Sequence, residues 1–404
     1  MPHDLNKPKY RLQTQAVLAG EIADPITGAS TPSIVMSNSF VVSKPQGFSI
    51  ESFDDERPYI YSRWDNPTVQ VLERKLAALE NAEDCACFGS GMAATAAVLH
   101  GFLSSGDHVV ASDVHYAGAS ELIRSLKDSI NVDSTRVDTS NLDMVENSIR
   151  PGATKLIWAE TPSNPLLKIT DLRGLSDLAS RQGARLVVDS TVATPIATRP
   201  VELGVDLVVH SLSKYIGGHG DAIGGAVIGS RDLIEHLRTS ERTHIGGILS
   251  PFNAWLIARG ATTLPLRMLA HSNNAMQVAE FLEGHPRVTR VLYPGLPNHP
   301  GHSLAKQQMD CYSSLLSFCV HDGPELAHRL PTSLNVIHYA VSLGSYRSLI
   351  YWLPTDEMLR TAFLLTEELE HAYLSLAGEG IFRLAVGLED PRDICEELDR
   401  VLSE

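Results

Sequence analysis

The sequence has no surplus of basic residues. It holds 33 Lys and Arg against 48 Asp and Glu, which gives a net charge of −15. Proteins that bind nucleic acids through the phosphates carry a basic surface. We therefore expect no nucleic-acid partner, and we expect the acidic surface mainly to keep the protein in solution.

Cysteine is also scarce, with five residues in a chain of 404. The number is odd and the residues are widely spread, which is typical of reduced thiols in a cytoplasmic protein and argues against a disulfide framework. Cys85 and Cys87 are separated by one residue, whereas zinc sites use pairs separated by at least two. We expect no metal site, and we expect these two cysteines to be buried in a strand.

Long uninterrupted apolar runs are missing as well. The first residues, MPHDLNKPKYRLQ, contain no apolar stretch of the kind found in signal peptides. Residues 85–106 carry no Asp, Glu, Lys or Arg, but Gly89-Ser90-Gly91 and Ser104-Ser105-Gly106 interrupt them. This pattern predicts a strand, a turn and a short helix, so we expect no membrane association.

The chain does contain alternating strand-like and helical segments. Its length exceeds that of one hydrophobic core, so two domains are the default expectation. Short apolar runs separated by amphipathic stretches indicate βαβ units and a mainly parallel sheet. The fold class is therefore predicted as α/β, with a large mainly parallel-sheet domain at residues 63–258. An extended arm at 1–62 precedes it, and a smaller α/β domain at 259–404 follows.

The smaller domain is predicted from its own pattern. Residues 250–285 are typical of a long helix with a proline break, and a final helix is expected at 393–402. Strands are expected at three stretches, 315–322, 335–343 and 382–390.

Chemically reactive residues follow several predicted strands of the large domain. In open α/β sheets, ligands bind outside the carboxyl ends of the strands. Gly89-Ser90-Gly91-Met92 opens a helix there, and its backbone N–H groups could bind an anion, although many tight turns look alike. Tyr116 could stack on a planar ligand or simply pack. Asp189 could act in catalysis or cap the next segment.

The stretch HSLSKYIGGHGD, residues 210–221, places Lys214 just after the apolar run at 206–209. Burial disfavours the ammonium and lowers the pKa of a lysine, which helps an amine to act as a nucleophile. A lysine nucleophile, a carboxylate, an aromatic ring and a glycine turn together suit pyridoxal 5'-phosphate (PLP). Lys214 would form a Schiff base with its aldehyde, and Asp189 would pair with its ring nitrogen.

Nine motifs in order extend this interpretation from about residue 59 to the C-terminus. They are YSRWDNPT (61–68), FGSGMAA (88–94), DVHYAG (113–118), ETPSNPLLKITDL (160–172), VVDSTVATP (187–195), HSLSKYIGGHGD (210–221), LSPFNAWLIARGATTLPLRM (249–268), SLGSYRSLI (342–350) and FRLAVGLED (382–390). With these motifs the sequence resembles the family of cystathionine γ-synthases, cystathionine γ-lyases and methionine γ-lyases, which are PLP-dependent enzymes of fold type I.

The resemblance implies a set of site residues. The catalytic residues would be Lys214, Tyr116 and Asp189. The cofactor would be bound by Tyr61, Arg63, Gly91, Met92, Tyr116, Asp189, Thr191, Ser211, Ser213 and Lys214. The substrate would be bound by Asn164, Ser342, Arg383 and Arg347. In the family, the pair matched by Tyr61 and Arg63 reaches the phosphate of a neighbouring subunit, so a homo-oligomer, with a homotetramer as the expected form, is implied.

The implied activity is γ-elimination from an L-amino acid with a γ leaving group, such as cystathionine, methionine, an O-acyl-homoserine or canavanine. A γ-replacement synthase of the cystathionine γ-synthase or O-acyl-homoserine sulfhydrylase type is the near alternative. A non-catalytic PLP-binding scaffold is the alternative from another class, and the intact set of site residues argues against it.

Three departures from the family pattern concern the choice of substrate. Asp65 stands where the family often has Gly or Ser, and Gly118 stands where methionine γ-lyases have Cys, which argues against methionine. Arg347 replaces a Glu of the SLGxxESL motif.

Two roles are open for Arg347. It could bind an acidic distal group such as a succinyl or phosphoryl ester, or it could pair with Asp54, Asp55 or Glu56 of the arm. If those acids are free, a basic tail such as the guanidino-oxy group of canavanine is a reasonable substrate group.

Overall fold

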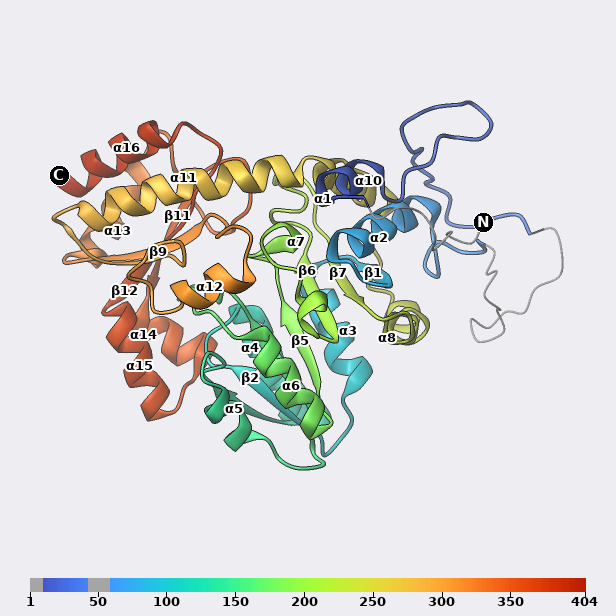
Figure 1. Cartoon of the computed structure of the whole chain (residues 1–404), viewed down its shortest axis with the longest axis horizontal. Coiled ribbons are helices and arrows are strands. Elements are labelled where there is room, and N and C mark those ends of the chain that lie inside the picture. Colours follow the sequence, from blue (N-terminus) through green and yellow to red (C-terminus); the bar gives the residue numbers. More distant parts are fainter. Residues whose placement is uncertain (1–9, 43–58) are drawn as a thin grey trace.

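The structure is a computed structural model, which describes residues 10–42 and 59–404. It contains two sheets joined by one long helix (Figure 1). The predicted α/β class with a large, mainly parallel sheet and a smaller second sheet is confirmed. Within the described ranges, no helix is long and apolar enough to cross a membrane.

The large sheet has seven strands in the order β1-β7-β6-β5-β4-β2-β3. Their bounds are β1 (Asp84–Phe88), β2 (His108–Ser112), β3 (Asp133–Val137), β4 (Thr154–Glu160), β5 (Arg185–Asp189), β6 (Leu207–Ser211) and β7 (Gly225–Gly229). Only β7 runs against the others, since it pairs antiparallel with both β1 and β6. The sheet is therefore parallel through β6, β5, β4, β2 and β3, and these strands end at one edge.

Helices cover both faces of the large sheet, as the continuous apolar strands require. On one face, the helical residues Leu72 and Leu178 belong to the same buried apolar cluster as Ile157 of β4. On the other face, Val98 and Ile123 pack over a second apolar layer. The helices of this half are α2 (Pro67–Glu80), α3 (Gly91–Phe102), α4 (Ala117–Ile130), α5 (Leu142–Ser148), α6 (Leu172–Gln182), α7 (Thr194–Ala197), α8 (Arg231–Leu237), α9 (Thr243–Ile245) and α10 (Pro251–Thr262).

The second sheet has five strands in the order β10-β11-β12-β9-β8. They are β8 (Val288–Leu292), β9 (Leu315–Val320), β10 (His338–Tyr339), β11 (Leu349–Pro354) and β12 (Gly380–Ala385), and the helices around them are α12 (His302–Gln308), α13 (Gly323–Ser333), α14 (Thr355–Met358), α15 (Glu367–Ala377) and α16 (Pro391–Ser403). The helix α11 (Leu264–Gly284) runs from α10 toward this sheet (Figure 1). The predicted helix with a proline break is confirmed, because α10 ends at Thr262 and Pro265 lies in the first turn of α11.

The N-terminal region contains a short helix that packs on the rest of the protein. A short helix, α1 (Leu12–Leu18), buries Ala16 against the body of the protein. The Nζ of Lys75 on α2 donates hydrogen bonds to the backbone oxygens of Ala16, at 2.6 Å, and Val17, at 3.3 Å. Since Lys75 is fully buried, the helix α1 is fixed to α2. The division into an arm and two domains after residues 62 and 258 stays a prediction.

Candidate active site

The reactive residues lie where the parallel strands end. Glu160 is the last residue of β4, Asp189 the last of β5 and Ser211 the last of β6, and Tyr116 follows β2 by four residues. Because these strands are parallel neighbours, their carboxyl ends bring the four residues to one edge of the sheet.

A cavity of about 540 Å³ opens at this edge. Its lining contains ten of the residues predicted for the site: Gly91, Met92, Tyr116, Asn164, Asp189, Thr191, Ser211, Ser213, Lys214 and Ser342. The sequence motifs that supply them are far apart along the chain, and the fold brings them together around one space.

Lys214 lies in the connection between β6 and β7, and its amine points to a hydroxyl of the smaller half. Its Nζ donates a hydrogen bond to the Oγ of Ser342 at 2.8 Å. Burial lowers the pKa of Lys214, and the positive charge of Arg383 lowers it further. The amine therefore reaches its neutral, nucleophilic form at a lower pH than an exposed lysine does.

Asp189 is a buried carboxylate with an incomplete set of partners. Its Oδ1 accepts a hydrogen bond from the backbone N–H of Thr191 at 2.9 Å. No lysine or arginine in the described ranges forms an ion pair with it, and burial raises the pKa of this acid. A buried carboxylate needs a cation or several donors, so the site is suited to a positively charged group.

The turn at residues 89–91 packs closely against the neighbouring strands, and glycines at two positions make this possible. Ser90 caps α3, accepting a hydrogen bond from the N–H of Ala93 at 3.1 Å. A Cβ atom at Gly91 would lie 2.9 Å from the Cβ of Ser211, and a Cβ atom at Gly225 would overlap the carbonyl oxygen of Ser90. These two glycines permit the close packing that turns the N-terminus of α3, an anion-binding element, toward the cavity.

Glu160 is a member of the site that sequence reasoning missed. Its Oε2 accepts a hydrogen bond from the N–H of Tyr116 at 2.8 Å, and its Oε1 accepts one from the N–H of Asn164 at 2.5 Å. Burial raises its pKa well above the ordinary range, and the charge of Asp189 adds to this rise. A carboxylate at the end of the apolar run KLIWAE repeats the pattern that pointed to Asp189, so the signal was present.

Arg383 on β12 lies beside the cavity and spans two of its lining residues. Its Nη1 donates to the Oδ1 of Asn164 at 3.3 Å, and its Nη2 donates to the backbone oxygen of Ser342 at 3.1 Å. Its Nε is buried and has no hydrogen-bond partner among the residues that the structure describes. Ser342 itself adopts a φ of 94°, which is uncommon outside glycine and is found where a site requires it.

Four residues predicted for the site do not line this cavity within the one chain, namely Arg383, which lies beside it, and Tyr61, Arg63 and Arg347. Arg63 donates from Nη1 to the backbone oxygen of Thr243 at 2.5 Å, and its guanidinium lies 5.5 Å from the centre of the Tyr61 ring. Arg347 donates from Nη1 to the Nε2 of His338 at 2.9 Å and is absent from the cavity lining.

The structure shows the surroundings of Asp65 and Gly118, two of the residues that depart from the family pattern. Asp65 bonds to the start of α2, where its Oδ1 accepts from the N–H of Asn66 at 2.8 Å and its Oδ2 from the amide of Gln70. A Cβ atom at Gly118 would lie 2.8 Å from the Cε1 of Tyr116. Residues 54–56 of the predicted pairing with Arg347 lie outside the described residues.

Comparisons with known proteins identify the family. The family model described as Cys/Met metabolism PLP-dependent enzyme matches residues 13–403. The canavanine γ-lyase of Rhizobium leguminosarum bv. trifolii is 42% identical over 96% of this chain and 95% of its own length. The cystathionine γ-synthase of Mycobacterium tuberculosis strain H37Rv is 39% identical over 96% of both chains. The crystal structure of metB from Corynebacterium glutamicum superposes with a TM-score of 0.88 at 36% identity, covering 98% of both chains.

The chain belongs to the Cys/Met metabolism PLP-dependent enzyme family. Its cofactor is pyridoxal 5'-phosphate. The residues around the cavity fit this group, because the buried Asp189 forms no ion pair with a lysine or arginine of the described ranges and the N-terminus of α3 lines the cavity at Gly91 and Met92.

Proposed function

We propose that this enzyme catalyses γ-elimination from an L-amino acid with a leaving group on Cγ, and that its cofactor is bound in the 540 Å³ cavity. The observation that carries the proposal is the position of Lys214, whose amine has a lowered pKa and lies in a cavity that also contains Asp189 and Tyr116. Bound PLP supplies an aldehyde that captures the substrate amine and a ring that takes up the electrons left on Cα.

The protein residues would divide the binding task. Asp189 would hold the ring nitrogen protonated, and Tyr116 would cover the ring. The turn at Gly91 and Met92 would donate backbone N–H groups to the phosphate, with the hydroxyls of Ser211 and Ser213 beside it. Thr191 would act indirectly, because its Oγ1 accepts a hydrogen bond from the N–H of Ser211 at 2.8 Å.

Arg383 would bind the substrate α-carboxylate together with Asn164 and Ser342. Its guanidinium is already oriented by these two neighbours, and its buried Nε still lacks a partner within the described part of the chain. The Nζ of Lys214 would take the proton from Cα. Loss of a second proton, from Cβ, would let the bond from Cγ to the leaving group break, and the phenol of Tyr116 would protonate that group.

The charges of the cavity favour a basic leaving group over an acidic one. Arg347 is bonded to His338 and does not line the cavity, so the predicted contact with a succinyl or phosphoryl ester has no support. Asp221 does line the cavity and is exposed. A guanidino-oxy tail such as that of canavanine would meet this carboxylate, and the sequence likeness to a canavanine γ-lyase agrees.

A substrate screen tests this proposal. The holoenzyme would be incubated without any added nucleophile with canavanine, cystathionine, methionine and O-acetyl-, O-succinyl- and O-phospho-homoserine. We expect hydroxyguanidine to be released from canavanine, with homoserine or 2-oxobutyrate as the carbon product. Turnover of the acidic esters alone would overturn the choice of a basic tail.

γ-Replacement is the second candidate, and the likeness to a cystathionine γ-synthase favours it. In that reaction an added thiol such as cysteine forms a bond to Cγ in place of the leaving group. The same incubation with and without cysteine separates the two reactions. Product that appears only with cysteine, as a condensed amino acid, would establish the synthase.

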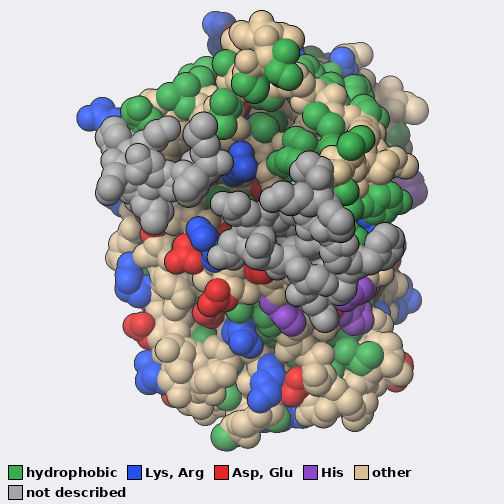
Figure 2. All heavy atoms as spheres, turned by 90° about the vertical axis from the view of Figure 1, so that its right-hand side faces the viewer, with side chains coloured by type: hydrophobic (Ala, Val, Ile, Leu, Met, Phe, Trp, Pro, Cys, Tyr) green, Lys and Arg blue, Asp and Glu red, His purple; other side chains and the backbone are tan. Residues whose placement is uncertain are grey.

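We further propose a homo-oligomer, with a homotetramer as the expected form and with Tyr61 and Arg63 serving the site of a neighbouring copy. The region of α1, α10 and α11 exposes apolar side chains, among them Leu18, Phe252 and Leu266. Figure 2 shows hydrophobic side chains gathered in the upper part of one face of the molecule. A cytoplasmic location also stays a prediction, and it accords with the five free thiols.

A further inference from the structure

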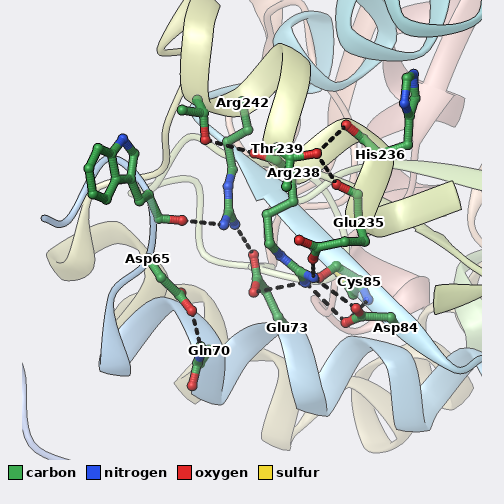
Figure 3. A network of polar contacts seen from close by, with 12 residues as sticks. Asp65, Gln70, Glu73, Asp84, Cys85, Glu235, His236, Arg238, Thr239 and Arg242 are labelled. Carbon is green, nitrogen blue, oxygen red and sulfur yellow. Dashed lines mark hydrogen bonds and ion pairs between the residues drawn. The ribbon is translucent and has the colours of Figure 1, made fainter. Parts of the chain in front are cut away.

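A buried ion pair lies outside the lining of the cavity. Glu73 on α2 and Arg242 are 4% and 3% exposed, and the Oε1 of Glu73 lies 2.8 Å from the Nη1 of Arg242. The Nη2 of Arg238 lies 3.6 Å from the Oε2 of the same carboxylate. Figure 3 shows Glu73 between the two guanidinium groups. Burying charges costs free energy even when they are paired, so such a cluster calls for a reason beyond stability.

The first connection of Glu73 leads to the phosphate turn. Its Oε1 also accepts a hydrogen bond from the N–H of Cys87 at 2.8 Å. Cys87 is the penultimate residue of β1, the strand that leads directly into the turn at 89–91. The carboxylate therefore fixes the position of the end of β1. Because the turn at 89–91 follows β1 directly, its position is fixed as well.

The second connection leads to the segment that carries Tyr61 and Arg63. The Nη2 of Arg242 donates to the backbone oxygen of Trp64 at 2.6 Å. The residue after Arg242, Thr243, accepts the hydrogen bond from the Nη1 of Arg63 through its backbone oxygen at 2.5 Å. One guanidinium thus joins Glu73 to the backbone of residues 61–65.

The chain that follows Arg242, residues 243–248, contacts the turn at 89–91. The N–H of Gly89 donates to the backbone oxygen of Gly247 at 2.7 Å, and Phe88 forms a β-bridge with Ile248. Arg242 ends a π-helical turn at Arg238–Arg242, a conformation often found at functional sites. The segment 242–248 therefore contacts both the turn at 89–91 and Arg63.

The other arginine anchors this arrangement to the sheet. Arg238 forms a fork with Asp84, with distances of 2.9 Å from Nη1 to Oδ2 and 3.1 Å from Nη2 to Oδ1. Its Nη2 also donates to the backbone oxygen of Cys85 at 2.8 Å. Two parallel bonds of this kind fix orientation as well as distance, so Glu73 is held on a rigid frame.

We propose that Glu73 is a positioning residue for the cofactor phosphate, because its carboxylate keeps the turn at 89–91 and the segment at 61–65 in one fixed relation. Glu73 acts through Cys87 and Arg242 and does not touch the cofactor. The inference rests on the PLP site described under the proposed function. The inference adds Glu73, which does not line the cavity, to the residues that determine cofactor affinity.

Three variants test the inference. Glu73→Gln keeps the shape and removes the charge. Arg242→Lys keeps a positive charge beside Glu73 but loses the fork that joins Glu73 to the Trp64 carbonyl. Glu397→Gln is the matched control, because Glu397 is 5% exposed and accepts the backbone N–H groups of residues 335–337, far from the cavity.

Each holoenzyme would be dialysed to equilibrium against graded concentrations of PLP, and bound cofactor and melting temperature would be measured. We expect the half-saturating PLP concentration to rise at least about tenfold in Glu73→Gln and Arg242→Lys, because small misplacements of binding groups are costly. In Glu397→Gln we expect it to stay within about twofold of the parent value, even though the melting temperature falls.

Unchanged cofactor affinity in both Glu73→Gln and Arg242→Lys would overturn the inference. An equal loss of cofactor in Glu397→Gln at a similar melting temperature would overturn it too, because global destabilisation would then explain the effect. If Glu73→Gln does not fold, Arg242→Lys is judged by the same criterion. A parent enzyme that binds no PLP would instead contradict the proposed function, so the two failures are distinguishable.

Discussion

Buried carboxylates occur in two contrasting settings in this enzyme. Glu73, below β1, is neutralised by two arginines that are themselves anchored. Asp189 and Glu160, at the ends of β5 and β4, face the cavity and form no ion pair with any described residue. The contrast teaches that the fold completes its charge pairs where it needs rigidity. It leaves charges incomplete where a ligand is to supply the missing partner.

The largest effect is expected from the cavity lysine. Lys214→Ala should lower kcat by at least about 10⁴-fold, because it removes both the nucleophile and the base that moves protons. Lys155→Ala is the matched control, since Lys155 bonds only to a surface carbonyl, that of Gly152. Product formation at saturating substrate measures both. Equal activity of Lys214→Ala and the control would contradict the proposal that the reaction takes place in this cavity.

Replacing one acid of each setting tests the contrast itself. Asp189→Asn should lower kcat by about 10²-fold or more but leave the free energy of unfolding unchanged or higher, because a buried unpaired charge is removed. Glu73→Gln should lower the free energy of unfolding by about 3 kcal/mol, because the buried Arg242 loses the carboxylate with which it pairs. Urea unfolding at pH 7 measures both stabilities. A similar loss of stability in the two variants would contradict the distinction.

The pH dependence of stability tests the two acids that face the cavity. Burial raises the pKa of both Asp189 and Glu160, and the folded state then binds more protons than the unfolded state above the ordinary carboxyl pKa. In the cofactor-free enzyme, the contribution of these two acids to stability should therefore be greatest below the ordinary carboxyl pKa of about 4 and fall as the pH rises through the raised values. The slope is at most about 1.4 kcal/mol per pH unit for each acid. Glu160→Gln should flatten this fall in thermal melts at several pH values, and an unchanged slope would contradict the assignment.

The smallest effect is expected outside both settings. Arg347→Ala should change KM by no more than about twofold for any substrate with a γ leaving group, as surface substitutions usually do, because Arg347 is bonded to His338 away from the cavity. Steady-state kinetics with canavanine and with O-succinyl-homoserine measure this. A rise in KM for the acidic ester alone would restore Arg347 as a substrate-binding residue.

The cavity could largely be predicted from the sequence, for a physical reason. Apolar runs locate parallel strands, and the residues that directly follow such runs must meet at one edge of the sheet. Asp189, Ser211 and Lys214 were found in this way. Glu160 ends a strand of the same kind and carried the same signal, but it was overlooked. No local pattern reveals its partners, which are the backbone N–H groups of residues 116 and 164.

Other parts of the fold could not be predicted from local pattern. The strand β7 has the short sequence GAVIG, too brief and rich in glycine to indicate a strand. Residues 335–343 were expected to form a full strand, but β10 contains only His338 and Tyr339. The expectation was wrong there because the chain leaves the sheet and reaches Ser342, whose positive φ no strand accommodates. That departure also brings the Ser342 hydroxyl to Lys214.

The close approach of Gly225 to Ser90 has a consequence for how this enzyme can diverge. Position 225 bears no reactive group, yet any side chain there would displace the carbonyl of Ser90 and with it the turn above β1. In a saturation mutagenesis library, two kinds of position should therefore not accept substitutions. At the first kind the side chain takes part in the chemistry, and at the second only glycine fits. In variants that evolve a new specificity, Gly225 should be retained more often than most of the residues that contact the substrate.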